Sequence, residues 1–270
     1  MQAYVYSYLL LTCFLFSILL VPVAKKIALR FGVLDKPNER KVHEAAKPLL
    51  GGLGIFGAML VAIILNVSGF YLVRQYSFVA NNFGQIIAQS AYLSAAVPKL
   101  AAILGGATVM VVVGILDDTK GKKFRYQYKF LAQFVAAGAV ALAGVHTSFL
   151  PYGWMNQLLS IFWIVGITNA FNLLDNMDGL SAGAAAIAAG IFFYISASQL
   201  QFFNAALLIT MVGALLGFLR YNFSPAKIFM GDTGSLFLGF MFGSITLTMS
   251  YTAVEASSRM PVTVVVPLWF

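Results

Sequence analysis

The sequence predicts an all-α fold, a bundle of helices that crosses a membrane several times. Hydrophobic residues make up 60% of the 270 residues and charged residues only 10%, whereas soluble domains carry about 25% charged residues. Apolar runs of about 20 residues, the length that spans a bilayer, recur along the whole chain. A membrane β-barrel would show short segments of alternating hydrophobicity instead, so the pattern favours helices.

Eight runs of membrane-spanning length are expected, and a ninth begins near residue 261. The eight cover about 3–24, 48–69, 98–116, 130–147, 157–173, 181–197, 202–219 and 233–250. Residues 70–97 are ambiguous, and a short interfacial helix is one interpretation of them. The ninth run has only about ten residues before Phe270, too few to cross a bilayer. We therefore expect the chain to be truncated, and we interpret 1–270 as a single transmembrane domain that lacks its C-terminal part.

Basic residues are distributed unevenly between the loops. Alternating spans place four loops on one side of the membrane: 25–47, 117–129, 169–180 and 220–232. That side holds every lysine and arginine except Arg74, Lys99 and Arg259. Basic loops are typical of the cytoplasmic side, so we expect the N-terminus outside and these four loops in the cytoplasm. Topology thereby explains the net charge of +8 without nucleic acid.

Acidic residues follow the same division, which the topology rule does not require. Every Asp and Glu except Glu255 falls on the predicted cytoplasmic side, and several lie at the ends of spans. Ionisable groups beside apolar segments are costly and usually functional. Solvated loop ends and helix caps are the simpler alternative for each acid taken alone.

The adjacent carboxylates Asp117 and Asp118 follow the expected end of the third span. The negative end of the helix dipole and their mutual repulsion both oppose two charges at this place. They need a positive partner, which is the basic run 120–129, a bound metal, or both. A solvated helix end neutralised by that run is an equally good explanation.

Polar residues recur every three positions at Asn169, Asn172, Asp175 and Asp178. On a helix this spacing brings successive members near each other, with a gradual drift around the axis. Capping of the next helix would explain one acid, but it leaves two amides and a second acid without a role.

Two further segments on the same side suit phosphate and metal. Asp232 stands between two glycines just before a span, and a carboxylate is the hard oxygen ligand that Mg²⁺ prefers. The basic loop 35–47 contains Arg40 and His43, which are suited to binding phosphate; a plain basic loop is the alternative. Together, the polar segments predict Mg²⁺-dependent phosphoryl transfer at one membrane face.

Four segments resemble the polyprenyl-phosphate N-acetylhexosamine-1-phosphate transferases of glycosyltransferase family 4. They are DKPNERKVHEAAKPLLGGLGIF, GILDDTKGKKFRYQYKFLAQ, NAFNLLDNMDGLSAG and FMGDTGSLFLG, in this order between about 35 and 240. The resemblance implies transfer of a sugar 1-phosphate from a UDP-sugar to undecaprenyl phosphate, with release of UMP and dependence on Mg²⁺ or Mn²⁺. The form of the first segment favours UDP-GlcNAc.

The same resemblance implies a multi-pass enzyme of the bacterial cytoplasmic membrane, with its site facing the cytoplasm. It would catalyse the first membrane step of an envelope glycan such as O-antigen or teichoic acid. Its partners would be the nucleotide sugar, undecaprenyl phosphate and membrane lipid, and a homodimer is compatible with the resemblance.

The resemblance also implies roles for individual residues. The catalytic residues would be Asp117, Asp118 and Asp175, and the metal ligands Asp232 and Asp175. The nucleotide sugar would be bound by Asn172, Asp178, Gly179, Phe229 and Lys129, and phosphate by Arg40 and His43. The sequence departs from the family at Asn176, where the family has glycine; asparagine suits that position if the backbone there needs a positive φ.

Three other hypotheses compete with this one. They are an ion-coupled transporter, a phospho-MurNAc-pentapeptide transferase of the same family, and a scaffold without catalysis. Carriers bind their substrates near the middle of the membrane, whereas the acids of this sequence gather at one predicted face.

Overall fold

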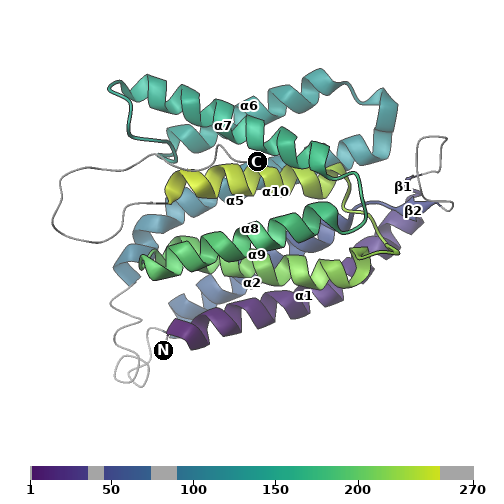
Figure 1. Cartoon of the computed structure of the whole chain (residues 1–270), viewed down its shortest axis with the longest axis horizontal. Coiled ribbons are helices and arrows are strands. Elements are labelled where there is room, and N and C mark those ends of the chain that lie inside the picture. Colours follow the sequence, from purple (N-terminus) through teal and green to yellow (C-terminus); the bar gives the residue numbers. More distant parts are fainter. Residues whose placement is uncertain (1, 36–45, 74–89, 250–270) are drawn as a thin grey trace.

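The computed structural model describes residues 2–35, 46–73 and 90–249 as a bundle of helices (Figure 1). The eight α-helices are α1 (Gln2–Arg30), α2 (Gly51–Val73), α5 (Ser90–Lys120), α6 (Tyr126–Leu142), α7 (Gly153–Leu174), α8 (Leu180–Ser198), α9 (Phe202–Asn222) and α10 (Gly231–Thr248). A 3-10 turn, Gly121–Lys123, joins α5 to α6. Two short antiparallel strands, β1 (Leu34–Asp35) and β2 (Lys47–Pro48), pair Leu34 with Pro48 and Asp35 with Lys47.

The predicted all-α membrane architecture is confirmed for this part of the chain. The helices α1, α2, α5, α7, α8 and α9 are long and apolar enough to cross a membrane, so the chain is a multi-pass membrane protein. The helices α6 and α10 are not among these six, and α6 has only 17 residues. The ninth span expected from 261 and most of the ambiguous segment, residues 74–89, lie outside the described residues.

The boundaries of α5 differ from the prediction of a span at 98–116. The helix runs from Ser90 to Lys120 and contains Pro98. Asp117 and Asp118 therefore belong to its last turn instead of following it. The helix continues through this charged turn because both carboxylates find hydrogen-bonding partners on other helices, as described below.

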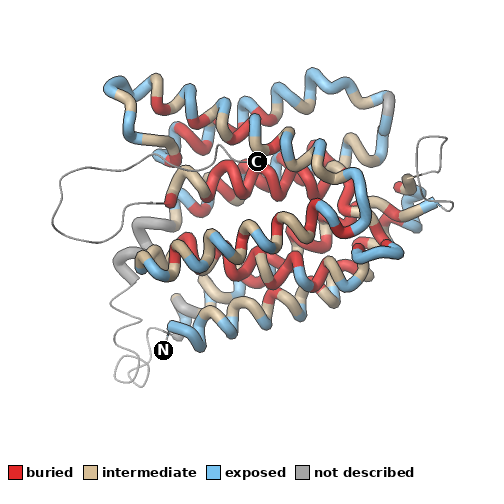
Figure 2. Tube along the Cα trace, viewed as in Figure 1, coloured by how far each residue is buried: buried red, intermediate tan, exposed pale blue. Residues whose placement is uncertain are grey.

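The helix α10 forms the centre of the bundle, as the buried tube in Figure 2 shows. Every residue from Thr233 to Ile245 is buried, and the helix packs against α5, α7 and α2. Two glycines allow a close approach to α7. A Cβ atom on Gly239 would lie 2.5 Å from Cα of Thr168, and one on Gly243 would lie 2.9 Å from Cα of Ile164.

The outer helices turn apolar side chains away from the bundle. Leu11, Leu15 and Leu19 of α1 recur every four residues and are more than half exposed, so they form one face of that helix. Ile187 and Ile191 of α8 are exposed in the same way. Apolar surface of this extent is uncommon on soluble proteins and suits contact with lipid.

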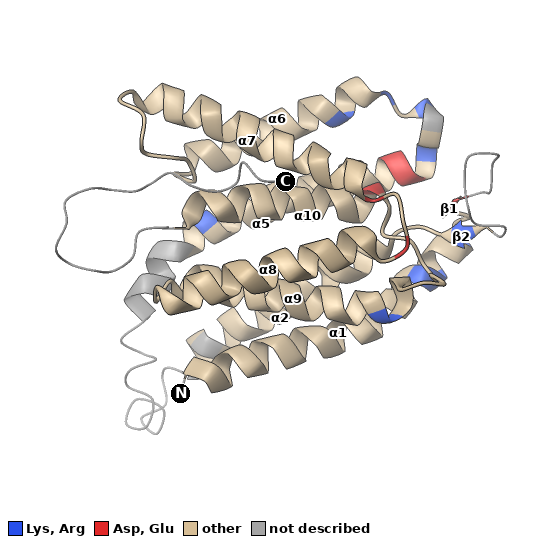
Figure 3. Ribbon diagram, viewed as in Figure 1, with Lys and Arg blue, Asp and Glu red and all other residues tan. Residues whose placement is uncertain are grey.

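Charged residues gather at one end of the bundle (Figure 3). This end is formed by the C-termini of α1, α5, α7 and α9 and the N-termini of α6 and α10. Lys99, near the start of α5, is the exception among the described residues. The acidic segments singled out in the sequence thus meet at one place.

Candidate active site

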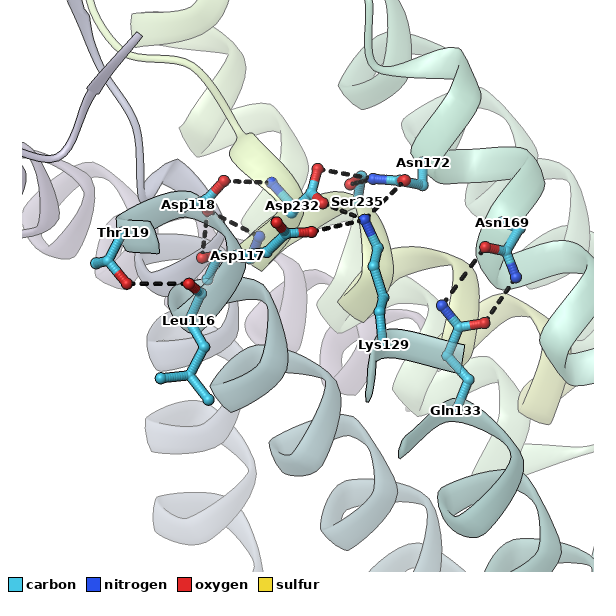
Figure 4. Close-up of polar contacts among 11 residues, drawn as sticks. Leu116, Asp117, Asp118, Thr119, Lys129, Gln133, Asn169, Asn172, Asp232 and Ser235 are labelled. Carbon is cyan, nitrogen blue, oxygen red and sulfur yellow. Dashed lines mark hydrogen bonds and ion pairs between the residues drawn. The ribbon is translucent and has the colours of Figure 1, made fainter. Parts of the chain in front are cut away.

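Lys129, in the first turn of α6, forms the centre of a polar network (Figure 4). Its Nζ donates hydrogen bonds to Asp117 Oδ2 at 2.9 Å, to Asn172 Oδ1 at 3.2 Å, and to Asp232 Oδ2. The two carboxylate contacts are ion pairs, and the lysine side chain is only 13% exposed. One ammonium group therefore joins helices α5, α6, α7 and α10. Lys129 was predicted to bind the nucleotide sugar, and it lies among the acids.

Asn172, in the last turn of α7, connects the same carboxylate to α10. Its Nδ2 donates to Asp232 Oδ1 at 2.9 Å and to Ser235 Oγ at 2.9 Å. Each oxygen of the Asp232 carboxylate thus has its own partner, Lys129 or Asn172. Ser235 was absent from the predicted site, although it lies three residues after Asp232 and thus on the same face of a helix.

Asp118 points away from this network and towards the start of α10. Its Oδ1 accepts the backbone N–H of Asp232 at 2.9 Å. Its Oδ2 accepts the backbone N–H of Thr233 at 3.0 Å and the Thr233 hydroxyl at 2.6 Å. These are N–H groups that a helix leaves without internal partners at its N-terminus. The adjacent acids of α5 therefore have different environments.

Asp175 directly follows α7 and is half-buried near the same carboxylates. Burial raises the pKa of Asp175 to about 7, and the negative charges of Asp232 and Asp118 act in the same direction, while a backbone hydrogen bond with Gly231 opposes them. Its hydrogen bond with Gly231 places it beside the start of α10, and its predicted roles as catalytic residue and metal ligand stay predictions. No described hydrogen bond joins its carboxylate to Lys129.

Asp178 and Gly179 join the α7–α8 turn to the loop between α9 and α10. Asp178 Oδ2 accepts the backbone N–H of Ala226 at 2.9 Å. The backbone N–H of Gly179 donates to Asn222 Oδ1 at 3.1 Å, and Asn222 Nδ2 donates to the Ile228 carbonyl at 2.9 Å. Within the described contacts, neither predicted nucleotide-binding residue reaches the Lys129 network. They hold the loop that carries Phe229.

Phe229 is tied to α2 through its backbone. Its carbonyl accepts the N–H of Gly51 at 3.0 Å, and its own N–H donates to the Pro48 carbonyl at 2.9 Å. The phenyl ring is partly exposed. Asn176 is not among the residues with positive φ, so the expected backbone reason for asparagine at that position was wrong.

The predicted phosphate-binding residues Arg40 and His43 lie outside the described residues. The structure does describe both ends of their loop. At one end, Lys47 Nζ donates to the Ala226 carbonyl at 2.7 Å. The C-terminal end of the basic loop 35–47 therefore lies beside the loop between α9 and α10.

Gln133 was missed by the sequence reasoning, although it forms a separate amide pair with Asn169 between α6 and α7. It is fully buried in α6, one turn after Lys129. Asn169 Nδ2 donates to its Oε1 at 2.6 Å, and its Nε2 donates to Asn169 Oδ1 at 3.5 Å. The sequence did contain an indication of this residue: Gln133 is a lone amide within an apolar span, four residues after Lys129 and so on the same face of the helix.

The donor chemistry of the site fits a hard divalent cation. Asp117 and Asp232 direct carboxylate oxygens at one positive group, the Lys129 ammonium, so a cation is accommodated between them. No three His, Cys, Asp or Glu residues of the described segments gather closely enough to hold a metal alone. Mg²⁺ is typically bound by one or two carboxylates, with water and substrate phosphates completing its coordination.

Comparisons with known proteins identify the family of the chain. The family model described as glycosyl transferase family 4 matches residues 100–250. The chain is 35% identical over 250 residues to a probable undecaprenyl-phosphate N-acetylglucosaminyl 1-phosphate transferase of Bacillus subtilis (strain 168), covering 89% of this chain and 62% of that relative. It is 31% identical over 251 residues to a phospho-N-acetylmuramoyl-pentapeptide-transferase of Bacillus mycoides (strain KBAB4), covering 86% of this chain and 70% of that relative.

The chain thus spans less than two thirds of the length of the Bacillus subtilis relative. The family match nevertheless includes Asp117, Lys129, Asn172 and Asp232, the residues that the structure joins in one network. On this match and these identities, the chain belongs to glycosyltransferase family 4.

Proposed function

We propose that this chain transfers GlcNAc 1-phosphate from UDP-GlcNAc to undecaprenyl phosphate and releases UMP. The observation that carries the proposal is the network in which Lys129 joins Asp117, Asp232 and Asn172 at one end of a membrane bundle. Phosphoryl transfer depends mainly on positioning and charge neutralisation, and this network supplies carboxylates, an ammonium group and an amide within hydrogen-bonding distance of each other.

Exposed apolar side chains on the helices that carry the network support a lipid acceptor. Leu131 of α6 is 62% exposed and Leu173 of α7 is 78% exposed, and these helices also carry Lys129 and Asn172. A lipid phosphate has a charged head and a long apolar tail. The network suits the head, and the outward apolar surface of the helices suits the tail.

The residues of the network take separate roles in this proposal. Asp117, whose Oδ2 is bound to Lys129, orients or deprotonates the lipid phosphate. Lys129 donates to phosphate oxygens as the substrates arrive, and Asn172 keeps the Asp232 carboxylate aligned. Asp232, with Asp117 or Asp175, holds Mg²⁺ or Mn²⁺, which supplies neutralisation of the diphosphate charge.

The remaining predicted residues are assigned to the nucleotide sugar. Asp178, Gly179 and Phe229 contact the uridine end, and Arg40 and His43 contact phosphate. Support comes from the contacts that gather the segments around Ala226 and Phe229 beside α10. In the proposed orientation this end faces the cytoplasm of a bacterium, where UDP-sugars are made, and the N-terminus lies outside.

UMP release tests the proposal. The full-length protein, purified in detergent, is incubated with UDP-GlcNAc, undecaprenyl phosphate and Mg²⁺, with Asp117→Asn as the matched variant. We expect lipid-dependent and metal-dependent UMP release that the variant lacks. UMP release equal to that of a mock preparation would contradict the proposal.

The similarity to a phospho-N-acetylmuramoyl-pentapeptide-transferase suggests UDP-MurNAc-pentapeptide as a second substrate to test. The phospho-N-acetylmuramoyl-pentapeptide-transferase of Bacillus mycoides is nearly as similar as the first relative, at 31% identity. The same assay with UDP-MurNAc-pentapeptide distinguishes the two, because we expect UMP release from UDP-GlcNAc alone. An ion-coupled carrier is disfavoured, since such proteins bind near mid-membrane and the described acids lie at one end.

A further inference from the structure

The two adjacent acids at the end of α5 differ in what they contact. Asp117 faces Lys129, whereas both oxygens of Asp118 accept hydrogen bonds from the first residues of α10. These bonds come from the Asp232 N–H and from the N–H and hydroxyl of Thr233. Asp118 therefore caps α10 from a different helix, a role that the neighbouring acid does not share.

Close packing leaves little freedom at this contact. Gly231, with φ +70°, lies so close that a Cβ atom there would be 2.6 Å from Asp118 Oδ2. A Cβ atom on Gly114 of α5 would be 2.4 Å from Cα of Thr233. Because neither position has room for a side chain, the start of α10 rests directly on the backbone of α5.

The contact bears directly on Asp232. The backbone N–H of Asp232 is bound by Asp118, while its side-chain oxygens are bound by Lys129 and Asn172. Asp232 is thus held at both ends. Thr233 is fully buried, so its hydroxyl reaches Asp118 but not a substrate.

We propose that Asp118 is a positioning residue, which holds Asp232 in place for a divalent cation through the cap on α10. The chemistry of the acidic pair then belongs to Asp117. This inference rests on the proposed function, because it assigns the cation to Asp232. It separates two neighbouring carboxylates that the sequence alone does not distinguish.

The buried hydroxyl of Thr233 provides the test. Thr233→Val removes one hydrogen bond to the Asp118 carboxylate, and Thr233→Ser keeps it as the matched control. Binding of Mn²⁺ is measured by electron paramagnetic resonance on the full-length protein, together with the Mg²⁺ dependence of UMP release. Since hydrogen bonds to charged groups are among the stronger ones, we expect Thr233→Val to weaken Mn²⁺ binding about tenfold and Thr233→Ser to stay within about twofold.

A positioning role makes further demands. In Thr233→Val, kcat at saturating Mg²⁺ should recover to near the unsubstituted value, because the reacting groups are unchanged. Asp118→Asn should weaken Mn²⁺ binding in the same direction, and the double variant should lose less than the sum of the two single losses, because both changes break the same cap.

Each outcome bears on a different statement. Unchanged Mn²⁺ binding in Thr233→Val, or loss of kcat in Asp118→Asn that no Mg²⁺ concentration restores, would overturn the positioning role and leave the proposed function standing. Failure of the unsubstituted protein to bind Mn²⁺ would overturn the cation site and the inference with it. A folded variant is recognised by its thermal unfolding midpoint, measured on each preparation.

Discussion

Both ends of the bundle contain satisfied polar groups, but among the described residues the charged side chains other than Lys99 gather at one end. At the start of α7, Asn156 makes four hydrogen bonds with Thr147, Leu150 and Tyr152, between 2.9 and 3.2 Å long. All its partners are uncharged backbone or hydroxyl groups. At the other end of α7, Asn172 shares its contacts with a lysine and a carboxylate.

The difference separates a structural network from a functional one. The Asn156 network uses both donors and the acceptor of its amide, so it closes the turn before α7 without any further partner. At the opposite end, Lys129 places one ammonium group between the carboxylates of Asp117 and Asp232, so these three side chains together carry an excess of negative charge. Partly buried charge is a weak source of stability, which supports the proposal that this network binds a cation or its complex with phosphate.

Beyond the Asp117→Asn variant, the largest effect is expected from Asp232→Asn, which keeps the shape of the side chain and removes its charge. UMP release should fall by about a hundredfold to a thousandfold, because the carboxylate proposed to hold the charge-neutralising cation is lost. The thermal unfolding midpoint should change little. A variant that kept more than a tenth of the activity would place the chemistry elsewhere.

The next effect is expected from Lys129→Gln, which replaces the central ammonium by a neutral amide. Loss of both ion pairs should lower kcat/KM for UDP-GlcNAc by about tenfold to a hundredfold, as one charge-assisted contact is worth about 1.5–3 kcal/mol. Lys123→Gln is the matched control, because Lys123 is exposed and has no described ion pair. Equal losses in the two variants would show that general basicity, not the network, matters.

Asn156→Ala should lower the stability of the fold and leave the catalytic activity unchanged, the reverse of the two substitutions above. Removing the amide takes away the partner of the Leu150 N–H and of the Leu150 carbonyl, at a cost of about 2 kcal/mol. The thermal unfolding midpoint should fall by several degrees, while UMP release per folded molecule stays unchanged. A drop in activity without a drop in stability would mean that the two ends are coupled.

The smallest effect is expected from substitution of Gln133, a buried residue outside both the Asn156 contacts and the Lys129 network. Gln133→Leu removes the side-chain partner of Asn169, which keeps its bond to the Val165 carbonyl, and should cost about 1 kcal/mol of stability. Adding Asn169→Leu should recover part of the loss, because no unpaired amide remains. The unfolding midpoints of both single variants and the double variant form the cycle that measures this coupling; additive losses would argue against a working pair.

Most of the architecture was predictable from hydrophobicity, because a span of about 20 apolar residues is a local property of the chain. The exceptions are α6 and α10, predicted as spans but not among the six helices long and apolar enough to cross a membrane, and the boundaries of α5, where local reasoning ended the helix before Asp117. Contacts with Lys129 and α10 keep that turn helical. The contact with Lys129 joins residues 12 positions apart and the contact with Asp232 joins residues 114 positions apart, so neither is visible in the local pattern of the helix.

The sequence by itself determined the helical membrane fold and the four polar segments, since residue type and spacing encode both. Only the tertiary structure decided which residues of these segments contact each other. It placed Lys129 between Asp117 and Asp232, turned Asp118 towards the start of α10, added Ser235 to the network, and paired Gln133 with Asn169. The physical reason is that neighbouring residues on a helix point in different directions, about 100° apart, so adjacent acids meet different partners only once other helices pack around them.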